Sequence, residues 1–154
     1  MPARPIVLDA NLLVLLIVGI ASPTYIGIHK RLRAYSLQDF DLLTRLLETA
    51  SRIIVTPNTL TEAVNLGRQI KEPARTRILQ AFRSVVADTT EIYIASVQAS
   101  RRNEFLRLGL TDAVVLGSAA AQDTIVTADL DLYLEAARQG RKVINFNHYR
   151  EAYL

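Results

Sequence analysis

The chain has 154 residues, half of them hydrophobic and 21% charged, and a formal net charge of +3. This length and composition exclude a disordered chain and predict one globular domain, residues 1–154, with a sizeable core. There is no Cys and there are two His, which excludes disulfides and thiolate metal sites and disfavours imidazole zinc sites and Ser-His-Asp triads. A reducing cytoplasm is the expected location.

The first apolar stretch covers residues 6–21 and is interrupted by Asp9 and Asn11. It is too short to span a bilayer and it contains an acid. It also lacks the small-residue cleavage pattern of a signal peptide, so we expect no membrane segment. The pattern predicts a short buried strand, 6–8, followed by an almost wholly apolar core helix, 11–20.

Helical patterns then alternate with short apolar strands along the rest of the chain. The expected strands are 52–56, 92–94, 124–127 and 142–146, and the expected helices are 37–50, 58–70, 73–86, 95–108, 111–121 and 130–139. The basic segment 25–35 fits either a loop or a short helix. This alternation predicts a three-layer α/β/α sandwich around a central, mainly parallel sheet.

Two acids stand where expected strands end: Asp9 follows the first strand and Asp129 follows the strand 124–127. Parallel strands end at the same edge of a sheet, which is where ligands bind in such folds, so the two acids should lie close together. Glu62, one turn into the next helix, can reach the same edge. Asp112 can also reach it from the first turn of its helix, with Thr111 as the expected N-cap.

Each of these acids has a simpler explanation when it is taken alone. Asp112 and Asp129 suit a first helical turn, where an acid is stabilised by ~0.3–1 kcal/mol, and Glu62 suits a solvated helix face. Asp9 is harder to explain because its neighbours are apolar. Four carboxylates in one pocket repel one another, at about 4 kcal/mol per pair ~4 Å apart for an effective dielectric near 20. Protonation or a bound cation must relieve that repulsion.

Oxygen ligands without His or Cys select a hard cation, Mg²⁺ or Mn²⁺, and such an ion in an open site usually serves phosphate chemistry. Without these four acids the formal charge rises from +3 to +7, and all but three of the 18 cations are Arg. An acidic pocket in a basic surface is what a metal-dependent nuclease needs.

Four segments, "IVLDANLLV", "TPNTLTEAVNL", "GLTDAVVLGSAA" and "TIVTADLDL", resemble in order and spacing the four acidic motifs of PIN domains. The resemblance covers residues 6–146. It implies a central parallel sheet with helices on both sides, and divalent-metal-dependent cleavage of RNA, as in the VapC-like toxins of bacterial toxin–antitoxin pairs. It further implies Mg²⁺ or Mn²⁺ as cofactor, an antitoxin protein as partner and a homodimer.

By position, the resemblance implies a catalytic cluster of Asp9, Glu62, Asp112 and Asp129, with metal ligands Asp9, Asp112 and Asp129 and auxiliary residues Asn11, Thr127 and Asp131. One or two metal ions would serve, and Glu62 or Asp112 would orient the attacking water or accept its proton. The segment 22–51 is longer than in a minimal toxin and is basic. It is a substrate-facing element, a partner-binding arm or a decoration.

Three other functions remain open. A PIN-like fold that binds RNA or protein without cleaving is the first, ranked lower because all four acids are present. A receiver domain fits poorly, because no acid pair follows the first strand and Lys142 precedes its strand. A hydrolase of small phosphate esters shares the metal chemistry, but Asn11 stands where a haloacid-dehalogenase-type site has its second acid.

Overall fold

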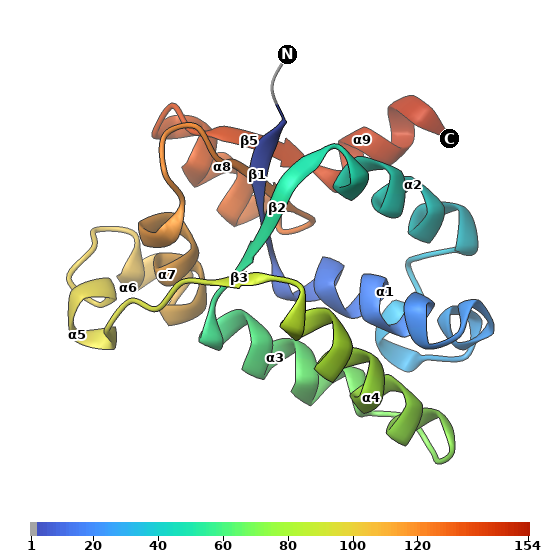
Figure 1. Cartoon of the computed structure of the whole chain (residues 1–154). Coiled ribbons are helices and arrows are strands. Elements are labelled where there is room, and N and C mark those ends of the chain that lie inside the picture. The colour runs from blue at the N-terminus through green and yellow to red at the C-terminus, as the bar shows by residue number, and fades with distance from the viewer. Residues whose placement is uncertain (1–2) are drawn as a thin grey trace.

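A five-stranded, all-parallel sheet in the order β3-β2-β1-β4-β5 forms the centre of the molecule (Figure 1). The computed structural model describes residues 3–154. Within that part of the chain the strands are β1 (Arg4–Leu8), β2 (Ala50–Val55), β3 (Thr90–Glu91), β4 (Thr124–Thr127) and β5 (Lys142–Asn145). β1 pairs with both β2 and β4, so it lies in the middle of the sheet.

Helices cover both faces of this sheet, which confirms the expected three-layer α/β/α sandwich. They are α1 (Ala10–Ala21), α2 (Leu37–Glu48), α3 (Pro57–Gly67), α4 (Ala74–Ala87), α5 (Ser96–Ala99), α6 (Phe105–Leu108), α7 (Leu110–Ser118), α8 (Leu130–Arg138) and α9 (Phe146–Tyr153), with 3-10 turns η1 (Pro23–Gly27) and η2 (Lys30–Leu32). In Figure 1, α1 and α2 lie to the right of the sheet and α7 and α8 to its left. No helix within residues 3–154 is long and apolar enough to cross a membrane.

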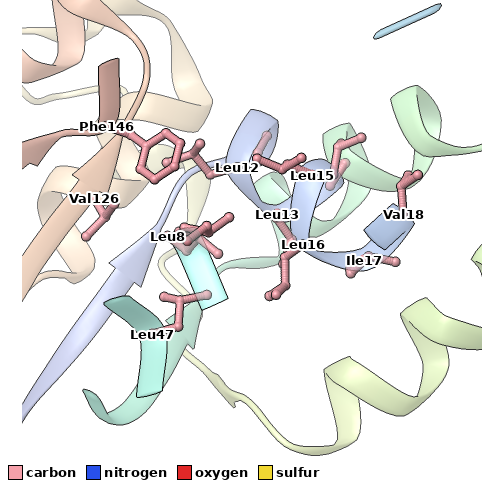
Figure 2. Close-up of a cluster of buried hydrophobic side chains, with 14 of the residues drawn as sticks. Leu8, Leu12, Leu13, Leu15, Leu16, Ile17, Val18, Leu47, Val126 and Phe146 are labelled. Carbon is pink, nitrogen blue, oxygen red and sulfur yellow. The ribbon is translucent and has the colours of Figure 1, made fainter. Parts of the chain in front are cut away.

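Alternate residues of each strand point to opposite faces, and each face has its own core. Leu8 and Val126 belong to the larger core, in which α1 lies against α2, α3 and α4. Phe146 of α9 is part of the same cluster (Figure 2). Val7 and Ile125 belong to the smaller core under α7 and α8. α1 is buried nearly all round, as its sequence predicted, and Gly19 permits close approach to α2 because an added Cβ would lie 2.2 Å from the Phe40 ring.

Local capping residues explain most of the helix starts. Ser36 and Asp39 form a capping box at the start of α2, and the Thr56 hydroxyl accepts a hydrogen bond from the Thr59 N–H at 3.1 Å to cap α3. α3 begins at Pro57, one position before the expected helix start at 58, because Pro is well suited to the first position of a helix.

Four expectations about local structure were wrong. The third strand lies at Thr90–Glu91 rather than 92–94. The Ile92 N–H donates to the Val55 carbonyl oxygen at 2.9 Å, and beyond this contact the chain leaves β2. The helix 95–108 is two short helices, α5 and α6, separated by a turn at which Arg102 bonds the buried Glu104. Gly109, with a φ of 88°, takes the N-cap position of α7 that was expected for Thr111.

The last error is an omission at the C-terminal end of the chain, where α9 was not expected. The Asn145 side chain accepts hydrogen bonds from the N–H groups of Asn147 and His148 at 2.9 and 3.4 Å and so starts this helix directly after β5. An Asn after an apolar strand is an N-cap signal that is readable in the sequence.

Candidate functional site

A small pocket of ≈ 40 Å³ lies at the carboxyl ends of β1 and β4 and contains all four predicted acids. Its lining is Asp9, Ala10, Asn11, Thr59, Glu62, Thr111, Asp112, Val115 and Asp129. The four acids come from four separate elements: the β1–α1 junction, α3, α7 and the β4–α8 junction. Residues up to 120 positions apart in the sequence are therefore brought together at one edge of the sheet.

Asp9 is the most firmly held of the four, with 7% of its surface exposed. Its Oδ1 accepts a hydrogen bond from the Leu12 N–H at 3.1 Å, which caps α1. Its Oδ2 accepts from the Ala128 N–H at 3.0 Å and from the Thr127 hydroxyl. Burial raises the pKa of the Asp9 carboxyl, and these hydrogen bonds oppose that rise. Asp9 therefore has a fixed orientation and ties β1 to the end of β4.

Thr127 connects two of the acids. Its hydroxyl donates to Asp9 Oδ2 and accepts from the Asp129 N–H at 2.9 Å. The expectation that Thr127 assists the acidic cluster thus has a structural basis: its fully buried side chain fixes both the Asp9 carboxylate and the backbone that carries Asp129.

Asp129 starts α8 and is exposed at the rim of the pocket. Its Oδ1 accepts from the Leu132 N–H at 3.0 Å, while its Oδ2 accepts no hydrogen bond within residues 3–154. Asp129 therefore caps α8 rather than lying in its first turn, and capping occupies only one of its two carboxylate oxygens. The second oxygen remains available to a ligand.

Asp112 is the acid whose ionisation responds most to the others. Burial, followed by the negative charges of Asp129, Asp9, Glu62 and Asp131, raises its pKa to about 7. Its carboxyl group makes no hydrogen bond within the described part of the chain, and neither does that of the exposed Glu62. At neutral pH the pocket therefore holds one carboxyl group that is only partly ionised.

The auxiliary residues divide into two groups. Asn11 lines the pocket, as expected, whereas Asp131 is exposed outside it and contributes only its charge to the pKa of Asp112. Thr59 and Thr111 line the pocket and were not predicted as site residues. Their signal was available, because Thr59 lies one helical turn before Glu62 and Thr111 directly precedes Asp112.

The donor set fits a hard divalent cation, since the polar side chains that line the pocket are carboxylates, an amide and hydroxyls, and the other two lining residues are the apolar Ala10 and Val115. The like charges that raise the pKa of Asp112 are those a cation would offset. Within residues 3–154, however, no three His, Cys, Asp or Glu side chains converge closely enough to hold an ion as they stand. Asp112 and Glu62, which no hydrogen bond restrains, would have to turn toward Asp9 and Asp129.

The sequence matches no protein-family profile, and a search of curated proteins gives no significant match.

Proposed function

We propose that this protein is a divalent-metal-dependent endoribonuclease of the PIN type, acting as the toxin of a toxin–antitoxin pair. The observation that carries the proposal is the gathering of Asp9, Glu62, Asp112 and Asp129 in one pocket at the carboxyl edge of a parallel sheet. The resemblance of their four segments to PIN motifs supports the same function.

Asp9, Asp112 and Asp129 are the residues that would hold Mg²⁺ or Mn²⁺. When bound, such an ion supplies Lewis acidity toward the phosphate and lowers the pKa of a coordinated water. Asp9 contributes a fixed carboxylate, because three donors orient it, and Asp129 contributes the oxygen that does not cap α8. Thr127 positions both.

Glu62 is the residue to which we assign proton acceptance from the attacking water. It is exposed at the pocket rim and no hydrogen bond within residues 3–154 restrains it, so it can approach a substrate phosphate. Asp112 would be occupied as a ligand, which leaves Glu62 as the unshared base.

Partners are proposed on the resemblance: an RNA substrate, a cognate antitoxin and a second copy of the chain. Exposed apolar side chains on α8, Leu130 and Leu134, are consistent with a protein contact. They lie one helical turn apart, on the same face. Light scattering of the purified chain measures whether it is a dimer.

A second function, binding of RNA or protein without cleavage, is favoured by one observation. The carboxylates do not converge on a common point in the structure as it stands. A protein that binds without cleaving needs no such convergence.

The test is cleavage of a mixed pool of structured RNAs with Mg²⁺, with Mn²⁺ and with chelator. Wild type is compared with Asp129→Asn and with Asp41→Asn, a matched control for an exposed acid on α2 away from the pocket. We expect metal-dependent cutting that is lost in Asp129→Asn and kept in Asp41→Asn. No cutting by antitoxin-free wild type, together with no divalent-metal binding by calorimetry, would contradict the nuclease proposal and favour the non-catalytic alternative.

A further inference from the structure

A second charged pocket, of opposite sign, lies at the other end of α3. Four cations, Lys30, Arg68, Lys71 and Arg75, line this basic pocket of ≈ 540 Å³, and no Asp or Glu does. Within residues 3–154 none of the four forms an ion pair. The nearby Glu72 accepts from the Thr76 N–H and hydroxyl at 2.7 and 2.5 Å, and these hydrogen bonds, with a smaller contribution from the Arg75 charge, lower its pKa.

The basic pocket is built from three separate segments that hydrogen bonds hold together. The buried His29 accepts from the Arg31 N–H at 3.1 Å through Nδ1, so its Nε2 carries the proton and donates to the Gly67 carbonyl oxygen at 2.9 Å. Arg31 Nε donates to the Gln69 side-chain oxygen at 2.7 Å. These contacts fix the turn that carries Lys30 against the C-terminal end of α3.

Arg75 approaches the same end of α3 from α4. Its Nε donates to the carbonyl oxygens of Arg68 and Ile70 at 3.2 and 3.0 Å, which satisfies acceptors beyond the helix end. Arg75 therefore has a structural role at the end of α3. The other three cations remain without a partner of opposite charge, and like charges held around one hollow favour a bound anion.

A third cleft connects the basic pocket with the acidic one. It has a volume of ≈ 470 Å³, shares Glu62 and Thr111 with the acidic pocket, and shares Asn65 with the basic pocket. Tyr93 stands at this cleft with 75% of its surface exposed. An exposed aromatic ring beside amide and hydroxyl groups is suited to stacking and hydrogen bonding of an unpaired base.

We propose that a single strand of RNA follows α3 across these three pockets, and this inference rests on the proposed function for its choice of RNA. The cleaved phosphate would lie at the acidic pocket, an adjoining base on Tyr93, and a further phosphate of the same strand among Lys30, Arg68 and Lys71. Glu62 and Arg68 are six residues apart on or at the end of one helix, or roughly 9 Å along its axis. That span corresponds to a few nucleotides.

The test uses the full chain carrying Asp129→Asn, so that RNA is bound but not cut, and fluorescence anisotropy with a labelled oligouridine at several salt concentrations. Arg68→Gln with Lys71→Gln removes two cations of the basic pocket. Arg45→Gln with Arg52→Gln removes two exposed cations from α2 and β2, and is the matched control.

We expect the basic-pocket pair to bind at least about tenfold more weakly, with a log–log salt slope smaller by up to about 0.7, since the basic pocket holds one phosphate and each phosphate contact to a single strand contributes ~0.7. The control pair should bind as the parent does. Tyr93→Leu should weaken binding about 5- to 100-fold with the salt slope unchanged, and Tyr93→Phe should restore it.

The outcomes separate this inference from the proposed function. If wild type never cuts RNA but these binding differences appear, the strand path holds and the nuclease proposal fails. If wild type cuts RNA but the basic-pocket and Tyr93 variants bind like the control, the strand path is wrong. If the Arg68→Gln, Lys71→Gln pair loses binding to a polyglutamate peptide while its RNA affinity stays that of the parent, the basic pocket binds an acidic protein segment and the proposal is overturned.

Discussion

The two ends of α3 carry charge in different ways. The acidic pocket places short side chains at strand ends and helix starts, and hydrogen bonds from backbone and Thr127 hold two of them. The basic pocket places long, mostly exposed side chains on turns and helix ends. Two acids of the acidic pocket thus have a defined geometry, which the proposed cleavage would require, whereas the basic pocket offers charge on longer side chains.

The largest effect should come from separating the roles of two acids in the acidic pocket. Glu62→Gln should lower kcat about 10²–10⁴-fold, the usual range for loss of a general base, while Mn²⁺ affinity stays close to that of wild type. Asp112→Asn should lower both kcat and the affinity for Mn²⁺. Cleavage kinetics with a parallel metal titration measure this, and an unchanged kcat in Glu62→Gln would remove it from the mechanism.

A smaller effect should follow from loosening the geometry of the acidic pocket without touching an acid. Thr127→Val leaves the buried Asp9 Oδ2 with one donor fewer, which should cost about 1–3 kcal/mol in the free energy of unfolding and also lower kcat. Thr127→Ser keeps the hydroxyl and should retain most of the wild-type stability and most of the wild-type kcat. Urea unfolding and cleavage rates provide the readouts, and equal behaviour of Val and Ser would show that the hydroxyl has no positioning role.

Salt should distinguish the basic pocket from the acidic one in the same assay. Raising monovalent salt should increase KM severalfold with little change in kcat, because it competes for phosphate contacts along the strand. In the Arg68→Gln, Lys71→Gln pair the salt dependence of KM should be shallower. Parallel salt dependences in this pair and in wild type would contradict the assignment.

The smallest effect concerns stability and pH. Burial and the neighbouring acids raise the pKa of Asp112 in the folded protein to about 7, above its ordinary value of 3.8, so the native state binds more protons between these values. Its contribution to stability is therefore fully present below the lower value and is lost as pH rises toward the upper one. Metal-free Asp112→Asn should show a flatter Tm profile over this range and melt higher than wild type at pH 8. A lower Tm at pH 8 would mean that the ionised carboxylate stabilises the fold.

The parts of the fold that follow from local patterns could be predicted from the sequence. β1, β4 and β5 are short apolar runs flanked by Asp or Asn, and the four acids stand next to the strand ends and helix starts that bring them together. β3 and the break between α5 and α6 could not, because pairing with Val55 and burial of Glu104 are long-range effects.

The basic pocket was also beyond reach of the sequence. Lys30 was visible in a basic segment of open role, but the contact between His29 and Gly67 that places it beside Arg68 spans 38 positions. A contact between residues so far apart in the sequence cannot be predicted from a local pattern. Lys30 of the segment 22–51 therefore lines the basic pocket, a position that the basic composition of the segment did not reveal.

The central claim, that the acidic pocket binds a divalent cation, is tested most directly by calorimetric titration of Mn²⁺ into wild type and Asp112→Asn near neutral pH. Because the pKa of Asp112 lies at about 7, binding to wild type should release protons, detected as a dependence of the heat on the buffer. Asp112→Asn should bind at least about tenfold more weakly and release fewer protons. Absence of binding to wild type, or equal binding to both proteins, would contradict the account.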